Sequence, residues 1–402
     1  MTSSLPQTPS SSSSRVRQIH AITGVRIVAA VWVILFHLRG NIASEFPRVY
    51  DLIGPIIIHG DYGVDLFFIV SGYVIALNYA DRMGIALDRK ASVKFWWARI
   101  ARIWPAYFLT LLFCAVWHGS FLIFHANDPV APRDFSVLSF FRQALLIVQW
   151  TEPDSNRLTW NGAAWTVSAE SLAYVIFPVI ALLLFRLGRA FGARALGVMG
   201  AVVVSPVVLF ALALGSIYAP YMWLLRILCE FLAGCLLYYA LSKVELSSHL
   251  RWVASILACA VVVLFVGFAY LIWYTGHERW GVLVVPLMFV LVGCLAVGDR
   301  LLPRLLAMRW FVVGGMASYS VYLVHMPIIE VFWFLQGHVS WVAPGSVGSK
   351  VGFILLPFIA LAAGYCLWRF FEEPARRAMR RMSLQHIPER AADDVVPSEV
   401  KA

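Results

Sequence analysis

The chain has 402 residues, of which 61% are hydrophobic and only 13% are charged. Its mean hydropathy of +0.77 lies far above the range of soluble globular domains and excludes that class. The net charge of +10 does not require a nucleic acid partner, because multi-pass membrane proteins collect Lys and Arg in their cytoplasmic loops. The composition therefore predicts an all-α, polytopic membrane helical bundle surrounded by membrane lipid.

The two ends of the chain differ from the rest. A Ser-rich, Pro-containing stretch opens the chain, so we expect residues 1–17 to be a disordered cytoplasmic tail. Residues 18–374 form one membrane domain, whose last helix we expect to stop at Pro374. Residues 375–402 are then a second cytoplasmic tail, polar and basic.

The first apolar run, Ala21–Leu38, carries a basic residue near each end, Arg26 and His37. The two are eleven positions apart, which at about 100° per residue is roughly three helical turns plus 20°. They therefore project from nearly the same face, roughly 16 Å apart along the axis. A charged residue in such a helix is costly unless it has a function or a partner.

Apolar runs of membrane-spanning length recur along the whole chain, and we expect about ten transmembrane helices. Lys and Arg are more frequent in the loops that share a side with the N-terminus, so we expect both termini to lie in the cytoplasm. The expected spans are 22–38, 55–79, 98–117, 165–185, 196–216, 222–241, 252–273, 279–297, 310–334 and 350–371.

One long outer loop, residues 118–164, contains an apolar stretch at Phe135–Trp150. Arg142 interrupts this stretch, and it is short for a span, so we expect an interfacial helix or a re-entrant cover. All six cysteines lie inside apolar runs, without the spacing of a zinc site or a disulfide framework. No metal is expected.

Ionisable residues gather at two depths. His37, Asp65, Glu170 and His325 come from four different spans, and the expected topology places all of them in the outer half of the membrane. A second group lies on the inner side, and its members are Arg26, Lys94, Arg99 and Arg102, with Tyr107 at the start of the third span. Intramembrane ionisable residues of this kind mark functional sites by default.

This division suits an acyl-coenzyme A thioester as co-substrate. Basic residues would hold its phosphates at the cytoplasmic side, and His37 would accept a proton from a hydroxyl acceptor. Either Glu170 or Asp65 could orient His37. Structural interpretations stay open beside these roles: Asp65 could cap its helix, Glu170 could pair with Arg226, and Tyr322 could simply pack between helices.

Several sequence segments match a known pattern in order. They are the Arg26–His37 pair, GDYGVDLFFIVSGYVIA, KFWWARIARIWPAYF, AAWTVSAESLAYVIFP, GGMASYSVYLVHMPI and FFEEPARR. Together they make the chain resemble the acyltransferase 3 family of bacterial membrane O-acyltransferases. The resemblance implies a ten-helix domain that uses a cytoplasmic acyl-CoA, usually acetyl-CoA, to acylate a hydroxyl of a surface or exported glycan or lipid-linked sugar.

The resemblance also implies roles for individual residues. His37 is the expected catalytic base, and Arg26 is tied to the donor, with Arg99 and Arg102 as the family's basic R-x-x-R pattern. The residues and the resemblance together predict three sets of site residues. The catalytic set is His37, Glu170, Asp65 and His325. The donor-binding set is Arg26, Lys94, Arg99, Arg102 and Tyr107, and the substrate-binding set is Trp165, Ser168, Ser318 and Tyr322.

Many family members carry a fused extracytoplasmic hydrolase-like domain, and we expect any such partner of this chain to be a separate protein. Two other functions remain open from the sequence. A transporter or flippase could use the same intramembrane charges, although the halves of the chain show no convincing inverted repeat. An acyltransferase acting on a small secreted metabolite would leave the same pattern in the sequence.

Overall fold

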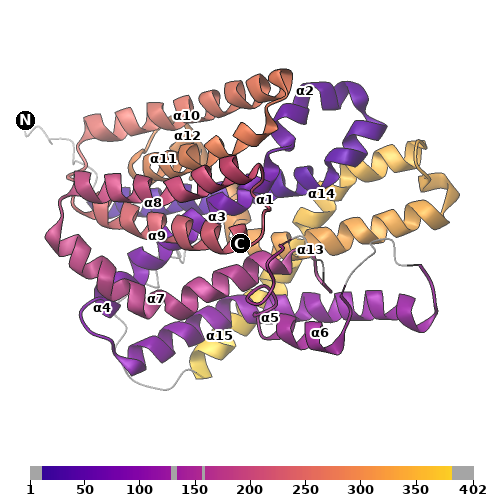
Figure 1. Ribbon diagram of the computed structural model, residues 1–402, viewed down its shortest axis with the longest axis horizontal. Coiled ribbons are helices and arrows are strands. Elements are labelled where there is room, and N and C mark those ends of the chain that lie inside the picture. Colours follow the sequence, from indigo (N-terminus) through magenta and orange to yellow (C-terminus); the bar gives the residue numbers. More distant parts are fainter. Residues whose placement is uncertain (1–10, 128–133, 156–158, 383–402) are drawn as a thin grey trace, which may run out of the picture.

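The computed structural model describes residues 11–127, 134–155 and 159–382. Within these ranges all regular structure is helical, and the long helices run side by side along the longest axis of the molecule (Figure 1). They are α1 (Ser11–Glu45), α5 (Arg89–Ile123), α7 (Ala164–Ala190), α8 (Ala193–Leu214), α9 (Met222–Ser242), α10 (Ser248–Thr275), α13 (Arg309–His338) and α14 (Val347–Leu367).

Shorter helices complete the bundle. They are α2 (Pro47–Ile57), α3 (Gly63–Ile75), α4 (Asp81–Met83), α6 (Val137–Ala144), α11 (Val284–Val297), α12 (Leu301–Leu306) and α15 (Glu373–Met382). Tighter 3₁₀ turns occur at η1 (Gly60–Tyr62), η3 (Glu278–Leu283) and η4 (Ser340–Val342), and wider π turns at η2 (Ala76–Ala80) and η5 (Trp368–Glu372).

The described residues contain ten helical segments long and apolar enough to cross a membrane, and each corresponds to one of the expected spans. The predicted fold class is therefore confirmed. The second span is built from two helices, α2 and α3, which η1 joins, and the last continues from α14 through η5 into α15. This is a multi-pass membrane protein.

Helix α1 lies at the centre of the bundle and packs against α2, α3, α11, α12, α13 and α14. Close approach is possible where glycines face another backbone. Gly72 of α3 lies against the carbonyl oxygen of Phe231 on α9, and Gly234 of α9 lies against that of Ile69 on α3. Pairs of small residues are the usual means by which membrane helices approach this closely.

The loop segment Phe135–Trp150 is not a span. Only α6 in it is regular helix, and the Trp104 indole of α5 donates a hydrogen bond to the Ala144 carbonyl at 3.0 Å. The following residues reach α7, where the Ser171 hydroxyl donates to the Leu146 carbonyl at 2.8 Å. The segment is thus a cover over α5 and α7, as expected from its length.

Two expectations about the ends need correction. The chain is helical from Ser11, so the helix begins inside the tail expected at 1–17, of which residues 1–10 lie outside the described part. Pro374 does not end the last helix, because the π turn η5 precedes it and α15 continues to Met382. Proline disturbs a regular α-turn, and the wider π turn accommodates it. Residues 383–402 of the expected C-terminal tail also lie outside the described part.

Candidate functional site

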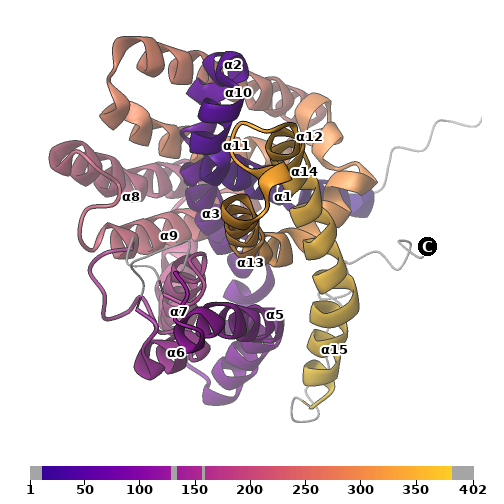
Figure 2. The same ribbon diagram turned by 90° about the vertical axis from the view of Figure 1, so that its right-hand side faces the viewer.

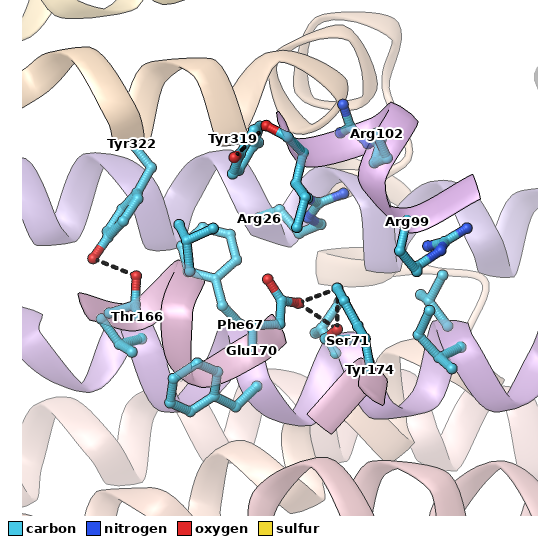
Figure 3. A pocket seen from close by; sticks show the side chains of 17 residues that line it. Arg26, Phe67, Ser71, Arg99, Arg102, Thr166, Glu170, Tyr174, Tyr319 and Tyr322 are labelled. Atoms are coloured by element: carbon cyan, nitrogen blue, oxygen red, sulfur yellow. Dashed lines mark hydrogen bonds between the residues drawn. The ribbon is translucent and has the colours of Figure 1, made fainter. Parts of the chain in front are cut away.

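A cavity of the described bundle lies between α1, α3, α5, α7 and α13 and has a volume of about 170 Å³. Its walls combine apolar side chains with a limited set of polar ones (Figure 3). The polar lining residues are Arg26, Ser71, Arg99, Arg102, Thr166, Glu170, Tyr174, Tyr319 and Tyr322.

One part of the cavity is basic. Arg26 enters from α1, and Arg99 and Arg102 enter from one turn of α5, so three guanidinium groups share one space (Figure 3). Arg99 donates to the Tyr79 hydroxyl at 2.9 Å and lies over its ring. Arginine presents several fixed donors that match phosphate oxygens, so this end can hold an anionic group of the phosphate type.

Glu170 faces this basic part. Its Oε1 accepts hydrogen bonds of 2.5 Å from both the Ser71 and the Tyr174 hydroxyl groups, which lie 3.1 Å from each other. The charge of Glu170 also acts on Arg26. Glu170 is therefore held in place by α3 and α7 together, and it provides the negative charge within a cavity that is otherwise cationic.

The opposite end of the cavity is closed by Thr166 and Tyr322, whose hydroxyl groups are hydrogen bonded at 2.9 Å (Figure 3). The Phe67 ring lies 6.1 Å from that of Tyr322, measured between centroids. Val64 and Phe68 add apolar surface to the lining. We call Phe67, Thr166 and Tyr322 the septum: all three line the cavity, and Tyr322 also contacts His325, which does not line it.

His37 and His325 lie behind the septum. Their ring centroids are 5.2 Å apart, and the His325 ring lies 5.3 Å from that of Tyr322. His325 is completely buried, whereas His37 is partly exposed. The Nδ1 of His325 contacts the Tyr322 carbonyl oxygen and must carry the proton there, so its Nε2 has a free lone pair. That Nε2 has no hydrogen-bond partner among the described residues.

The two carboxylates expected to orient His37 are engaged elsewhere. Asp65 receives two hydrogen bonds, of 2.8 and 2.7 Å, from the buried Arg226 of α9. Glu170 lies in the cavity with Arg26. Across the described ranges, neither carboxylate forms a hydrogen bond or ion pair with His37. The titratable neighbour of His37 is instead His325.

The other expected site residues are outside the cavity lining. Trp165 lies against Arg226, 5.6 Å from ring centroid to Cζ, and Ser168 accepts a hydrogen bond from the Gln149 backbone at 3.0 Å. Ser318 donates to the Gly315 carbonyl of its own helix. Lys94 and Tyr107 are on α5, and neither lines the cavity.

Sequence reasoning missed several polar residues of the cavity. Ser71 and Tyr174 hold Glu170, and Tyr174 could have been found because it follows Glu170 by four positions on the same helix face. Tyr319, which lines the cavity beside Arg102, left no such signal. In the part of the chain that the structure describes, no group of three or more His, Cys, Asp or Glu could hold a metal ion.

Comparison with known proteins shows the family of the chain. Residues 19–369 match a family model described as "Acyltransferase domain". "Acyltransferase MdmB" of Streptomyces mycarofaciens is 27% identical over 416 aligned residues, which cover 94% of this chain and 97% of MdmB. No solved structure matches the chain.

Two further relatives are longer proteins. "O-acetyltransferase OatA" of Staphylococcus aureus is 24% identical over 90% of this chain and 58% of its own length. "Putative peptidoglycan O-acetyltransferase YrhL" of Bacillus subtilis is 26% identical over 78% of this chain and 49% of its own length. The chain thus spans about half the length of these two relatives.

Proposed function

This chain belongs to the acyltransferase 3 family, and we propose that it transfers an acyl group, with acetyl as the first expectation, from a cytoplasmic acyl-CoA to a hydroxyl of an exported or surface glycan or lipid-linked sugar. That the protein is a membrane acyltransferase follows from its family and its ten candidate spans. The family membership leaves no support for the transporter or flippase alternative.

The observation that carries the donor assignment is the convergence of Arg26, Arg99 and Arg102 on one cavity inside the membrane domain. A coenzyme A thioester joins an anionic nucleotide to a long, mostly uncharged arm, and the cavity likewise passes from a basic part to a closed end with apolar walls. Charge-assisted hydrogen bonds from guanidinium groups are strong and suit phosphate. The arm would then point toward the septum and the two histidines.

The proposed reaction forms one bond and breaks one. The acceptor oxygen attacks the thioester carbonyl carbon, the carbon–sulfur bond breaks, and the acceptor proton passes to His37. The coenzyme A thiolate leaves and takes up a proton. His37 is suited to the base role because an imidazole titrates near neutral pH, and His325 beside it offers a second nitrogen lone pair.

Because the thioester must reach His37, the septum has to open during the reaction. Its hydrogen bond between Thr166 and Tyr322 joins α7 to α13, so a small relative movement of these helices would break it. Such gating steps are common where a site must admit a substrate and exclude water.

The acceptor is proposed from the relatives. OatA and YrhL are named as O-acetyltransferases, and the name of YrhL specifies peptidoglycan, which supports a glycan hydroxyl. Such an acceptor lies outside the cytoplasm, which is consistent with a bacterial inner membrane location and cytoplasmic termini.

The test measures binding and hydrolysis of radiolabelled acetyl-CoA by the purified protein in nanodiscs. We expect saturable binding by the wild type, weakened by at least about tenfold in Arg26→Ala because charge-assisted hydrogen bonds to phosphate are lost. His37→Ala should keep donor binding and lose label release.

The matched control is Arg48→Ala, which removes an exposed arginine of α2 and should leave both measurements unchanged. A folded wild-type protein that binds no acetyl-CoA would contradict the donor assignment. Near-normal release by His37→Ala would contradict the role of His37 alone.

A further inference from the structure

Glu372 is a buried carboxylate that the reaction described above does not use. It lies in the π turn η5, with none of its surface exposed to solvent. It forms an ion pair with Arg102 of α5, and the Ser320 hydroxyl of α13 donates to its Oε2 at 2.5 Å. Glu372 itself does not line the cavity, whereas Arg102 does.

The next residue, Glu373, has different partners. Glu373 receives hydrogen bonds from Arg376 at 2.9 Å and Arg377 at 2.7 Å, both from its own helix α15. Adjacent residues on a helix point about 100° apart, so one carboxylate faces α5 and α13 and the other faces along α15. Both carboxylates are buried, and only Glu372 contacts a residue that lines the cavity.

Arg102 needs such a partner to stay where it is. It shares the cavity with Arg26 and Arg99, whose like charges oppose it. Its other contacts are weak: Nη2 lies 3.4 Å from the Met316 carbonyl oxygen, and the Tyr319 ring lies 5.7 Å from Cζ. The Arg102 side chain is 20% exposed, so without Glu372 its guanidinium would turn toward water and away from the like charges of the cavity.

A second contact attaches the same C-terminal segment to α5. The Trp97 indole, five residues before Arg102, donates to the Met379 carbonyl of α15 at 2.8 Å. Figure 2 shows α14 and α15 following each other as one tilted column along the side of the bundle. The segment from Trp368 to Met382 therefore supports the turn of α5 that carries the arginines.

From these contacts we infer that Glu372 is a positioning residue of the donor site: it holds the Arg102 guanidinium toward the cavity, where it binds the phosphates of the acyl-CoA. The inference rests on the proposed function, because it takes acyl-CoA as the ligand of the basic cavity. It explains why the chain continues as a helix past Pro374, since the π turn aims Glu372 inward while α15 stays on α5.

The test compares Glu372→Gln with the matched control Glu373→Gln in nanodiscs, using the Kd for acetyl-CoA and the rate of thioester hydrolysis at saturating donor. We expect Glu372→Gln to raise Kd about tenfold, as when one charge-assisted hydrogen bond is weakened, and to change the saturated rate by less than about threefold. Glu373→Gln should change neither value. A general loss of structure would weaken donor binding and lower the saturated rate together, and would not give this split.

A double variant tests whether Glu372 acts through Arg102. Arg102→Gln alone should weaken donor binding, and adding Glu372→Gln should cause no further weakening, because the group that Glu372 holds is gone. Independent, multiplying effects would overturn the inference, as would an unchanged or lower Kd for the single variant Glu372→Gln.

If Glu372→Gln does not fold, Ser320→Ala decides instead, because it removes one contact of Glu372 and keeps the charge. A raised Kd with an intact saturated rate supports the positioning role, and an unchanged Kd overturns it. A wild-type protein that binds no acetyl-CoA overturns the proposed function and this inference together, whereas wild-type binding without a Glu372 effect overturns the inference alone.

Discussion

At the scale of single residues, Asp65 and Arg226 show how a buried charge pair differs from a catalytic group. Both are almost completely buried, and the carboxylate and guanidinium meet through two parallel hydrogen bonds. Glu230 lies one turn further along α9 and is also buried. A pair of this kind joins α3 to α9, and removing one partner costs far more than removing both.

We therefore expect Asp65→Asn to destabilise the protein by about 3–5 kcal/mol, because the buried Arg226 would lose the carboxylate that accepts two of its hydrogen bonds. Thermal unfolding of the purified protein in detergent measures the effect. The double variant Asp65→Leu with Arg226→Leu should recover much of the lost stability. If Asp65→Asn instead unfolded like the wild type and lost only turnover, Asp65 would belong to the chemistry after all.

At the scale of helices, α3 and α9 approach each other through glycines. A Cβ added at Gly72 would lie 1.9 Å from the Phe231 carbonyl oxygen, and one at Gly234 would lie 2.1 Å from that of Ile69. Neither distance can be tolerated without moving a backbone. The close contact matters for the site, because α3 also carries Phe67 and Ser71.

Gly72→Ala should consequently separate the two helices and lower stability by about 1–3 kcal/mol, the usual cost of overpacking. Gly267→Ala on α10 is the control, because nothing lies within 4 Å of the added methyl group. Its unfolding temperature should stay the same or rise slightly, since alanine favours helix over glycine. Equal unfolding temperatures for both variants would mean that α3 and α9 are not tightly packed at Gly72.

At the scale of the whole molecule, the ten spans imply that alternate loops lie on opposite sides of the membrane. Glu278 and Lys243 are both exposed, and they lie at opposite ends of α10. From the excess of Lys and Arg on the side of the N-terminus, we propose that the Lys243 side is cytoplasmic.

In a variant without the native cysteines, Glu278→Cys should react with a membrane-impermeant maleimide in intact cells. Lys243→Cys should react only after the membrane is opened. Labelling of Lys243→Cys in intact cells, with Glu278→Cys protected, would reverse the orientation and with it the assignment of a cytoplasmic donor.

The helices could be predicted from the sequence because apolar length and charge determine a membrane span. The same reasoning predicts a similar depth for His37 and His325, and the structure brings their rings to 5.2 Å between centroids. The partners of the buried charged residues could not be predicted, because they depend on how each helix is rotated about its axis. The sequence suggested that Arg226 could pair with Glu170, whereas in the structure Arg226 pairs with Asp65. The helix past Pro374 was also missed, since a π turn leaves no composition signal.

The septum has an electrical consequence for a cell that maintains a membrane potential. Under the proposed function, an acyl group leaves a cytoplasmic thiolate and replaces an outer proton, which carries one positive charge outward per turnover unless a proton returns. Outward movement of that charge costs about 2.3 kcal/mol for every 100 mV of potential, inside negative. The hydroxyl groups of Thr166 and Tyr322 are hydrogen bonded to each other, and we propose that they pass this proton back toward the thiolate. We therefore expect acyl transfer to be electroneutral, and its rate in energised vesicles to be independent of voltage.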